Sequence, residues 1–198
     1  MTPPVPESLE AQSLLWLHAH SSELLDRVFV VSHDTGALRS WAFVVLAFAL
    51  CHRRRGERAA ARLWLGLGLT TLVLQEGLKF AIQRPRPALW PQLVSPGGFS
   101  FPSGHALAAA TFCPMLAWSL SLLVPRLRHA FWAVALSIAL WIALGRLYLG
   151  VHWPSDVLAG LALGALQAAL ALERSRRRRV LRSEGRRGGG TSRTASTT

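Results

Sequence analysis

A short polar segment, Pro102-Ser103-Gly104-His105, stands directly before an apolar run at residues 106–124. Pro102 fixes its own φ, Ser103 can cap the first N–H groups of a following helix, and Gly104 permits close backbone approach to a ligand. Because a helix N-terminus offers free N–H groups and a partial positive charge, this junction is suited to bind a phosphate, with His105 beside it as proton donor or acceptor. Taken alone, the four residues fit a plain helix start equally well.

Basic residues on both sides of this segment could complete an anion site. Lys79, Arg84 and Arg86 come before it and Arg146 comes after it, each near the end of an apolar run. Two arginines can hold a phosphate in a bidentate manner and a lysine adds a point charge, so together they would stabilise a transferring phosphoryl group. An isolated arginine at a span end is more often a boundary residue, and Arg84, which has no matched partner, fits that interpretation best. Glu76 most simply pairs with Lys79 three residues later.

His152 and Asp156 have the spacing of a nucleophile and its support. If a helix begins at Pro154, a favoured first helical position, the Asp156 carboxylate can reach back to one ring nitrogen of His152 and leave the other free to attack phosphorus. We expect His105 to protonate the leaving oxygen and then to activate water as a base. The five remaining histidines are interpreted as surface or interfacial residues: His18, His20, His33, His52 and His129.

The composition indicates a membrane protein. Of the 198 residues, 51% are hydrophobic and only 16% are charged, which is below the usual quarter for soluble proteins. The formal net charge of +12 could mark nucleic-acid binding, but nine arginines follow Glu173, next to an apolar segment. Such a tail is more typical of a topology signal or a contact with anionic lipid, so no nucleic-acid partner is expected. Cys51 and Cys113 both lie in apolar runs, so a disulfide framework is not indicated.

The apolar pattern predicts an all-α integral membrane bundle of about five transmembrane helices. The expected spans are residues 37–51, 63–82, 106–124, 130–149 and 157–172. Residues 8–31 have a helical period but too many charges to cross a bilayer, so we expect an amphipathic helix that lies in the interface. The alternative is a cap over the site, and if the segment inserts, it forms a sixth span. Residues 32–36 are predicted to be a turn. The expected division is 1–36 interfacial segment, 37–173 transmembrane domain and 174–198 basic disordered tail.

The positions of the arginines predict the orientation of the bundle. The basic loop at residues 53–62, the connection at residues 125–129 and the tail fall on one side of a five-span topology, which the positive-inside rule assigns to the cytoplasm. The three polar clusters then meet at the opposite, non-cytoplasmic face. We therefore expect one site on that face, built from residues 79–86, 103–105 and 146–156.

These residues resemble the type 2 phosphatidic acid phosphatase family, whose signature has the three parts KxxxxxxRP, PSGH and SRxxxxxHxxxD. Here the first part runs from Lys79 to Arg86-Pro87, the second is residues 102–105, and the third is Arg146, His152 and Asp156 at the expected intervals. The match departs from the signature at one position, where Gly145 replaces the usual Ser. The motifs cover residues 79–156, and three spaced parts in the correct order are far more specific than any one of them.

The resemblance implies a helical membrane phosphatase of lipid phosphates or diphosphates that needs no metal or other cofactor. It implies a phosphohistidine on His152, supported by Asp156, with His105 as the acid and base. The residues implied in phosphate binding are Lys79, Arg86, Ser103, Gly104 and Arg146. Phosphatidic acid, phosphatidylglycerol phosphate and a polyprenyl diphosphate are the substrates to consider, in a multi-pass protein of the cell inner membrane.

Two other readings remain open from the sequence. A transporter or scaffold could keep the phosphate cradle and bind a lipid or phosphate without hydrolysis. The same signature occurs in vanadium-dependent haloperoxidases, which are soluble, and five apolar spans argue against them. The sequence does not indicate the oligomeric state or the headgroup preference.

Overall fold

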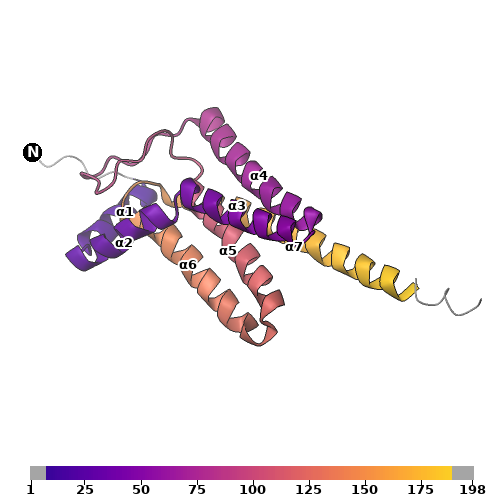
Figure 1. The fold of residues 1–198 in the computed structure, drawn as a ribbon. Helices are drawn as coiled ribbons and strands as arrows, with labels where there is room; N and C mark the ends of the chain where they lie inside the picture. Colours follow the sequence, from indigo (N-terminus) through magenta and orange to yellow (C-terminus); the bar gives the residue numbers. More distant parts are fainter. Residues whose placement is uncertain (1–7, 189–198) are drawn as a thin grey trace, which may run out of the picture.

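The chain folds into a helical bundle, described from residue 8 to residue 188 in a computed structural model (Figure 1). No strand occurs among these residues, so the predicted all-α class is confirmed. A 3-10 turn, η1 (Pro125–Leu127), joins two of the helices. The helices in chain order are α1 (Leu9–Ala19), α2 (Glu23–Thr35), α3 (Leu38–Arg54), α4 (Arg58–Ile82), α5 (Gly104–Leu123), α6 (Arg128–Tyr148) and α7 (Pro154–Gly188).

Helix α5 lies at the centre of the bundle and packs against α6 and α7. Its buried face is rich in alanine, and Leu107 is fully buried within it. Two glycines of α7 allow the helices to approach closely: a Cβ added at Gly160 would come within 2.5 Å of the Ser103 carbonyl oxygen, and one at Gly164 within 2.3 Å of the Leu107 carbonyl oxygen. Their four-residue spacing therefore serves close helix contact, which fixes the start of α7 beside the start of α5.

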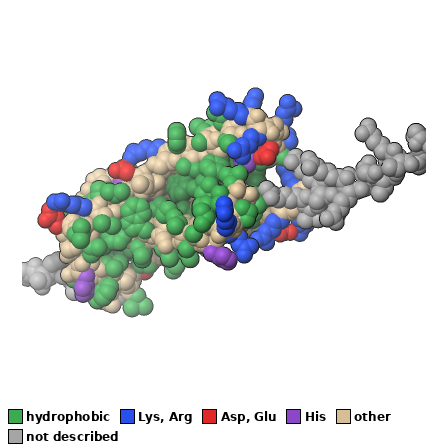
Figure 2. Space-filling view, turned by 60° about the horizontal axis from the view of Figure 1, so that its bottom comes forward, with side chains coloured by type: hydrophobic (Ala, Val, Ile, Leu, Met, Phe, Trp, Pro, Cys, Tyr) green, Lys and Arg blue, Asp and Glu red, His purple; other side chains and the backbone are tan. Residues whose placement is uncertain are grey.

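The lengths and composition of the helices suit a membrane. Helices α4, α5, η1 with α6, and the first part of α7 are each long and apolar enough to cross one, and a fifth span is possible if α2 and α3, bent by 48°, act together. Figure 2 shows a broad hydrophobic band across the middle of the molecule, with many of the Lys and Arg side chains in view toward the end that carries the C-terminal part of α7. The expected membrane bundle of about five spans agrees with this arrangement, although residues 37–51 form a span only together with α2.

The N-terminal segment differs from its prediction. It forms two helices rather than one, and α2 continues to Thr35 through residues that were expected to be a turn. Both helices contact α6, and Ser32 of α2 is fully buried there. This packing agrees with the alternative of a cap over the site, and the interfacial position of the segment stays a prediction.

The C-terminal segment also differs from its prediction. Helix α7 runs to Gly188 as one 35-residue helix, where disorder was expected from residue 174. At about 1.5 Å per residue it is roughly 52 Å long, whereas a hydrocarbon core is about 30 Å thick. The helix therefore extends well past any span that it makes. The rest of the expected tail, residues 189–198, lies outside the described residues.

Candidate active site

The three polar clusters meet in one cavity of about 190 Å³ at the end of the bundle where α4 and α6 finish and α5 and α7 begin. The cavity wall is completed by Pro96 and Gly97 of the loop before α5 and by Ala37, which lies between α2 and α3. Two further predicted residues, Ser103 and Asp156, are fully buried beside the start of α5 and of α7. Six of the eight predicted site residues line the cavity itself: Lys79, Arg86, Gly104, His105, Arg146 and His152.

His152 lies in the connection between α6 and α7 and is almost fully buried, with 3% of its surface exposed. The Arg86 Nη1 group lies 3.2 Å from its Nε2 atom. Because a guanidinium can only donate, Nε2 must carry the lone pair, and the proton of the neutral ring then resides on Nδ1. Burial lowers the pKa of His152 from 6.5 to about 4, although the neighbouring Asp156 carboxylate opposes the shift. The ring is therefore neutral at pH 7, with a nucleophilic nitrogen on the side of Arg86.

Asp156 stands behind His152 on the first turn of α7. Its Oδ2 atom is 3.6 Å from His152 Nδ1, which is longer than a hydrogen bond, and that Nδ1 has no hydrogen-bond partner among residues 8–188. The carboxylate instead accepts hydrogen bonds from the Ser100 hydroxyl, the Trp153 backbone N–H at 2.9 Å and Arg84 Nη1 at 2.7 Å. These donors fix the carboxylate close enough to stabilise a positive charge on the ring, but without the direct contact expected from the spacing.

Arg84 is not the isolated boundary residue that the sequence suggested. Its two terminal nitrogens bridge Asp156 at 2.7 Å and Glu10 at 2.6 Å. Glu10 in turn accepts hydrogen bonds from the backbone N–H and the hydroxyl of Ser155, at 2.9 and 2.6 Å. Arg84 therefore neutralises the buried Asp156 carboxylate and ties α1 to the start of α7.

The loop before α5 holds Arg86 in position. Its guanidinium donates to the backbone carbonyls of Gly97, Gly98, Phe99 and Val151 at 2.7–3.2 Å. Because these acceptors come from both sides of the group, its orientation is fixed. Lys79, on the last turn of α4, lies 3.6 Å from Glu76, so the predicted pair is present.

Arg146 is fully buried at the end of α6 and is held by the N-terminal segment. Its Nη1 donates to His33 Nδ1 at 2.9 Å and its Nη2 to the Ser32 hydroxyl at 3.1 Å, while Nε has no partner. A Cβ added at Gly145 would lie 2.1 Å from the Ser32 oxygen. Ser32 therefore fills the space that a side chain at position 145 would need, and it supplies a hydroxyl where the family signature usually has one.

His105 also contacts the N-terminal segment. Its Nε2 lies 3.0 Å from the backbone carbonyl oxygen of His33, and the two rings stack with centroids 5.3 Å apart. Because a carbonyl can only accept, Nε2 carries the proton and Nδ1 has the lone pair. The sequence analysis thus missed the contacts of Ser32 and His33 with predicted site residues; His33, expected to be a surface or interfacial residue, is half-buried. The only local signal was their position at a polar break between two apolar segments.

The start of α5 differs in one respect from the prediction. The Ser103 side chain makes no capping hydrogen bond, and its buried hydroxyl has no partner. A Cβ at Gly104 would meet the Gln75 side-chain oxygen at 2.2 Å, so the glycine permits a close approach of α4 and α5. The unpaired Ser103 hydroxyl, the free Arg146 Nε and the N–H groups of this helix start leave several donors beside three cationic side chains. This arrangement suits an oxyanion with more than one negative charge.

Comparisons with known proteins show which family the chain resembles. The profile of the PAP2 superfamily matches residues 59–179. The chain is 41% identical to phosphatidylglycerophosphatase B of Bacillus subtilis over 100 residues, and this alignment covers 49% of each protein. It is 37% identical to lipid A 1-phosphatase of Rhizobium etli over 115 residues, and this alignment covers 51% of this chain and 46% of the relative. It thus spans about half the length of these curated relatives. The crystal structure of the transmembrane PAP2-type phosphatidylglycerolphosphate phosphatase of Bacillus subtilis superposes with a TM-score of 0.78 at 28% identity, over 89% of both chains.

Proposed function

The chain belongs to the PAP2 superfamily, and from this membership we propose that it is an integral membrane phosphohydrolase that removes a phosphate from a lipid phosphate or diphosphate. The observation that carries the proposal is the His152 Nε2 lone pair, which lies 3.2 Å from Arg86 in the cavity that Lys79 and Arg146 also line. A neutral imidazole beside three cations is suited to attack a bound phosphoryl group.

The proposed reaction has two steps. In the first, His152 Nε2 forms a bond to phosphorus, the bond from phosphorus to the leaving oxygen breaks, and His105 gives that oxygen a proton. The imidazolium that results has its Nδ1–H facing Asp156, whose negative charge stabilises it. In the second step His105 takes a proton from water, the water oxygen bonds to phosphorus, and the phosphorus–nitrogen bond breaks to release phosphate.

Phosphate binding in this proposal falls to Lys79, Arg86 and Arg146, with the Ser103 hydroxyl and the Gly104 backbone N–H. The bound phosphoryl group takes over the Arg86 donor that now faces His152, which frees Nε2 for attack. The His105 Nε2–H group is hydrogen-bonded to the His33 carbonyl and Nδ1 holds the lone pair, so in this proposal Nδ1 takes up a proton as the anionic substrate binds, gives it to the leaving oxygen, and later takes the proton from water.

The substrate class follows from the membrane setting and from the relatives. Proteins similar to this chain are named phosphatidylglycerophosphatase B, lipid A 1-phosphatase and undecaprenyl-diphosphatase. All three names describe a phosphate on a lipid, and we infer that the substrate here is a phosphomonoester or diphosphate whose apolar part stays in the bilayer. The basic residues 53–62 and the basic part of α7 favour placing the site on the non-cytoplasmic face, with the C-terminal end in the cytoplasm.

Phosphate release by the purified protein in detergent tests the proposal, with a panel of lipid monophosphates and diphosphates as substrates. His105→Ala is expected to lower kcat by about 10² or more, as for other general acids and bases, and His152→Ala by a larger factor. His129→Ala, at the exposed start of α6, is the matched control and is expected to keep the full rate. An undiminished rate in either of the first two variants refutes the assigned role.

Brief exposure to substrate labelled in its phosphate separates hydrolysis from binding alone. The proposed enzyme is expected to carry label on His152, with more label in His105→Ala if water activation becomes limiting. Intact lipid binding without label or phosphate release would instead favour a transporter or scaffold. Vanadate is expected to inhibit, and oxidation of halide in its presence would favour haloperoxidase chemistry.

A further inference from the structure

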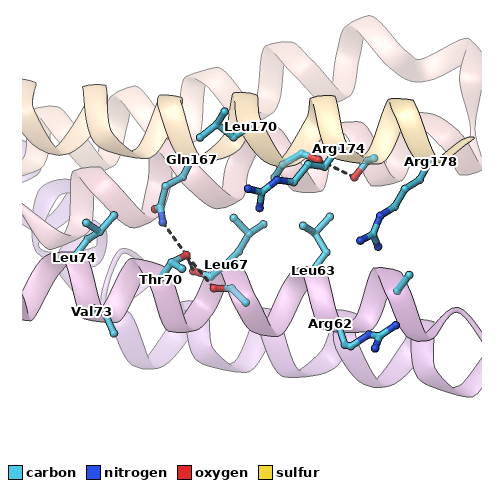
Figure 3. Close-up of a pocket in the computed structure, with 14 residues that line it drawn as sticks. Arg62, Leu63, Leu67, Thr70, Val73, Leu74, Gln167, Leu170, Arg174 and Arg178 are labelled. Atoms are coloured by element: carbon cyan, nitrogen blue, oxygen red, sulfur yellow. Dashed lines mark hydrogen bonds between the residues drawn. The ribbon is translucent and has the colours of Figure 1, made fainter. Parts of the chain in front are cut away.

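A second cavity lies between α4 and α7, away from the proposed active site (Figure 3). Its volume is about 660 Å³, and it shares no lining residue with the catalytic cavity. Leu63 and Leu67 of α4 and Leu170 of α7 contribute to its apolar wall. The size and apolar lining of this groove are those of a site for a small or lipid-like molecule.

One end of the groove is strongly basic. Arg62 of α4 and Arg174 and Arg178 of α7 line it, and Figure 3 shows Arg178 extending from α7 into the gap toward α4. Among the side chains that the structure describes, none of these three forms an ion pair; Glu173, the nearby acid on α7, pairs with Arg177 at 2.7 Å. Three cations that share one cavity without a carboxylate repel one another, so this end is suited to an anionic ligand.

The basic end lies far from the catalytic residues along α4. Lys79 lies 17 positions after Arg62 on α4, which is about 26 Å along the helix and close to the thickness of a hydrocarbon core. A polar cluster lies part-way along the groove: Gln167 and Thr70, which both line it, are hydrogen-bonded at 2.9 Å, and the Thr111 hydroxyl donates to Gln167 at 3.1 Å. The basic end of the groove therefore lies toward the opposite membrane boundary, and the groove shares no lining residue with the catalytic cavity.

We propose that this groove binds an anionic phospholipid of the leaflet opposite the active site, with its phosphate between the three arginines and an acyl chain along the leucines. Basic pockets between membrane helices bind such lipids, because the phosphate meets the guanidinium groups while the chain stays in apolar surroundings. A second copy of the chain is disfavoured, since a two-fold contact at this groove would bring the same arginines against one another. The inference does not depend on the proposed reaction.

Intact-protein mass spectrometry of the full chain tests the charged end, after release from nanodiscs that contain equal amounts of phosphatidylglycerol and phosphatidylcholine. Wild-type protein is expected to retain phosphatidylglycerol, and Arg174→Gln/Arg178→Gln to retain about tenfold less. The control Arg126→Gln/Arg128→Gln removes the same charge from the exposed turn between α5 and α6 and is expected to retain the wild-type amount. Equal retention of the two lipids, or equal retention in the two variants, overturns the proposal.

Gly66 and Gly77 of α4 provide a matched test of the apolar wall. A Cβ added at either glycine meets no atom within 4 Å, and only Gly66 lines the groove. Gly66→Phe is expected to displace the lipid, whereas Gly77→Phe is expected to retain it. Arg86→Gln, in the catalytic cavity, is also expected to retain the lipid, and its loss there would place the lipid in that cavity and overturn the proposal. A dimer that only Gly66→Phe dissociates would assign the groove to a second copy instead.

Discussion

Exchanging the residues at positions 32 and 145 tests how Arg146 is held. In Gly145→Ser the new Cβ would lie 2.1 Å from the Ser32 oxygen and 3.2 Å from Phe29 Cδ1. Contacts below 3.0 Å do not persist, so the Ser32 hydroxyl must turn away from Arg146 or α2 must shift from α6, and overpacking of this kind costs about 1–3 kcal/mol. We expect Gly145→Ser to lower both the Tm and kcat/KM.

Ser32→Ala alone removes one hydrogen-bond acceptor from the fully buried Arg146 guanidinium. Hydrogen bonds to charged groups contribute about 1.5–3 kcal/mol. Because His33 remains as a partner of Arg146, we expect a loss at the lower limit, which corresponds to about a tenfold fall in kcat/KM. Ser32→Ala/Gly145→Ser removes the 2.1 Å contact and returns a hydroxyl to the same place from α6. The double variant is therefore expected to be more active than Gly145→Ser.

The assay is phosphate release from the best lipid substrate by the four proteins of this cycle, with the Tm of each measured in the same detergent. A coupling of 1 kcal/mol or more between the two positions is expected, because they share one space. Additive losses, or a Gly145→Ser protein with the wild-type rate and Tm, would show that Ser32 does not take the place of a side chain at position 145.

Three further results are expected. Arg84→Gln leaves the buried Asp156 carboxylate without its ion pair and should lower the Tm and kcat together, by an amount on the order of 3 kcal/mol in stability; an unchanged Tm would contradict the bridging role. The rate constant kcat/KM should rise with pH through about pH 4, because only the neutral ring of His152 is nucleophilic and burial lowers its pKa to that value; it should fall again at higher pH, because His105 must carry a proton to give to the leaving oxygen. An acid limb near pH 6.5 would contradict the assignment. Gly104→Ala should lower kcat/KM because its Cβ meets the Gln75 side chain at 2.2 Å, and Gln75→Ala in the same protein should restore part of the loss.

The convergence of the three polar clusters could be predicted because it follows from local patterns. Apolar runs of span length set the number of crossings, and successive crossings place helix ends alternately at the two faces of the membrane. Lys79, His105 and His152 lie within a turn or so of such ends, so counting spans was enough to bring them together. The structure places all three on one cavity.

The residues that hold the cluster could not be predicted in the same way. Ser32 and His33 contact Arg146 across 114 and 113 positions of sequence, and Glu10 meets Arg84 across 74. Such pairs depend on how the N-terminal helices pack on the bundle, and neither periodicity nor spacing encodes that packing. The same reason explains why Arg84 looked isolated in the sequence.

The N-terminal helices lie outside residues 59–179, the part that matches the family profile, yet they supply two of the groups that hold Arg146. Relatives can therefore share every motif and still support that arginine differently. Residues 8–35 can therefore be exchanged as a unit: replacing them with the equivalent helices of a relative would change how Arg146 is held and leave the proposed reacting groups unchanged.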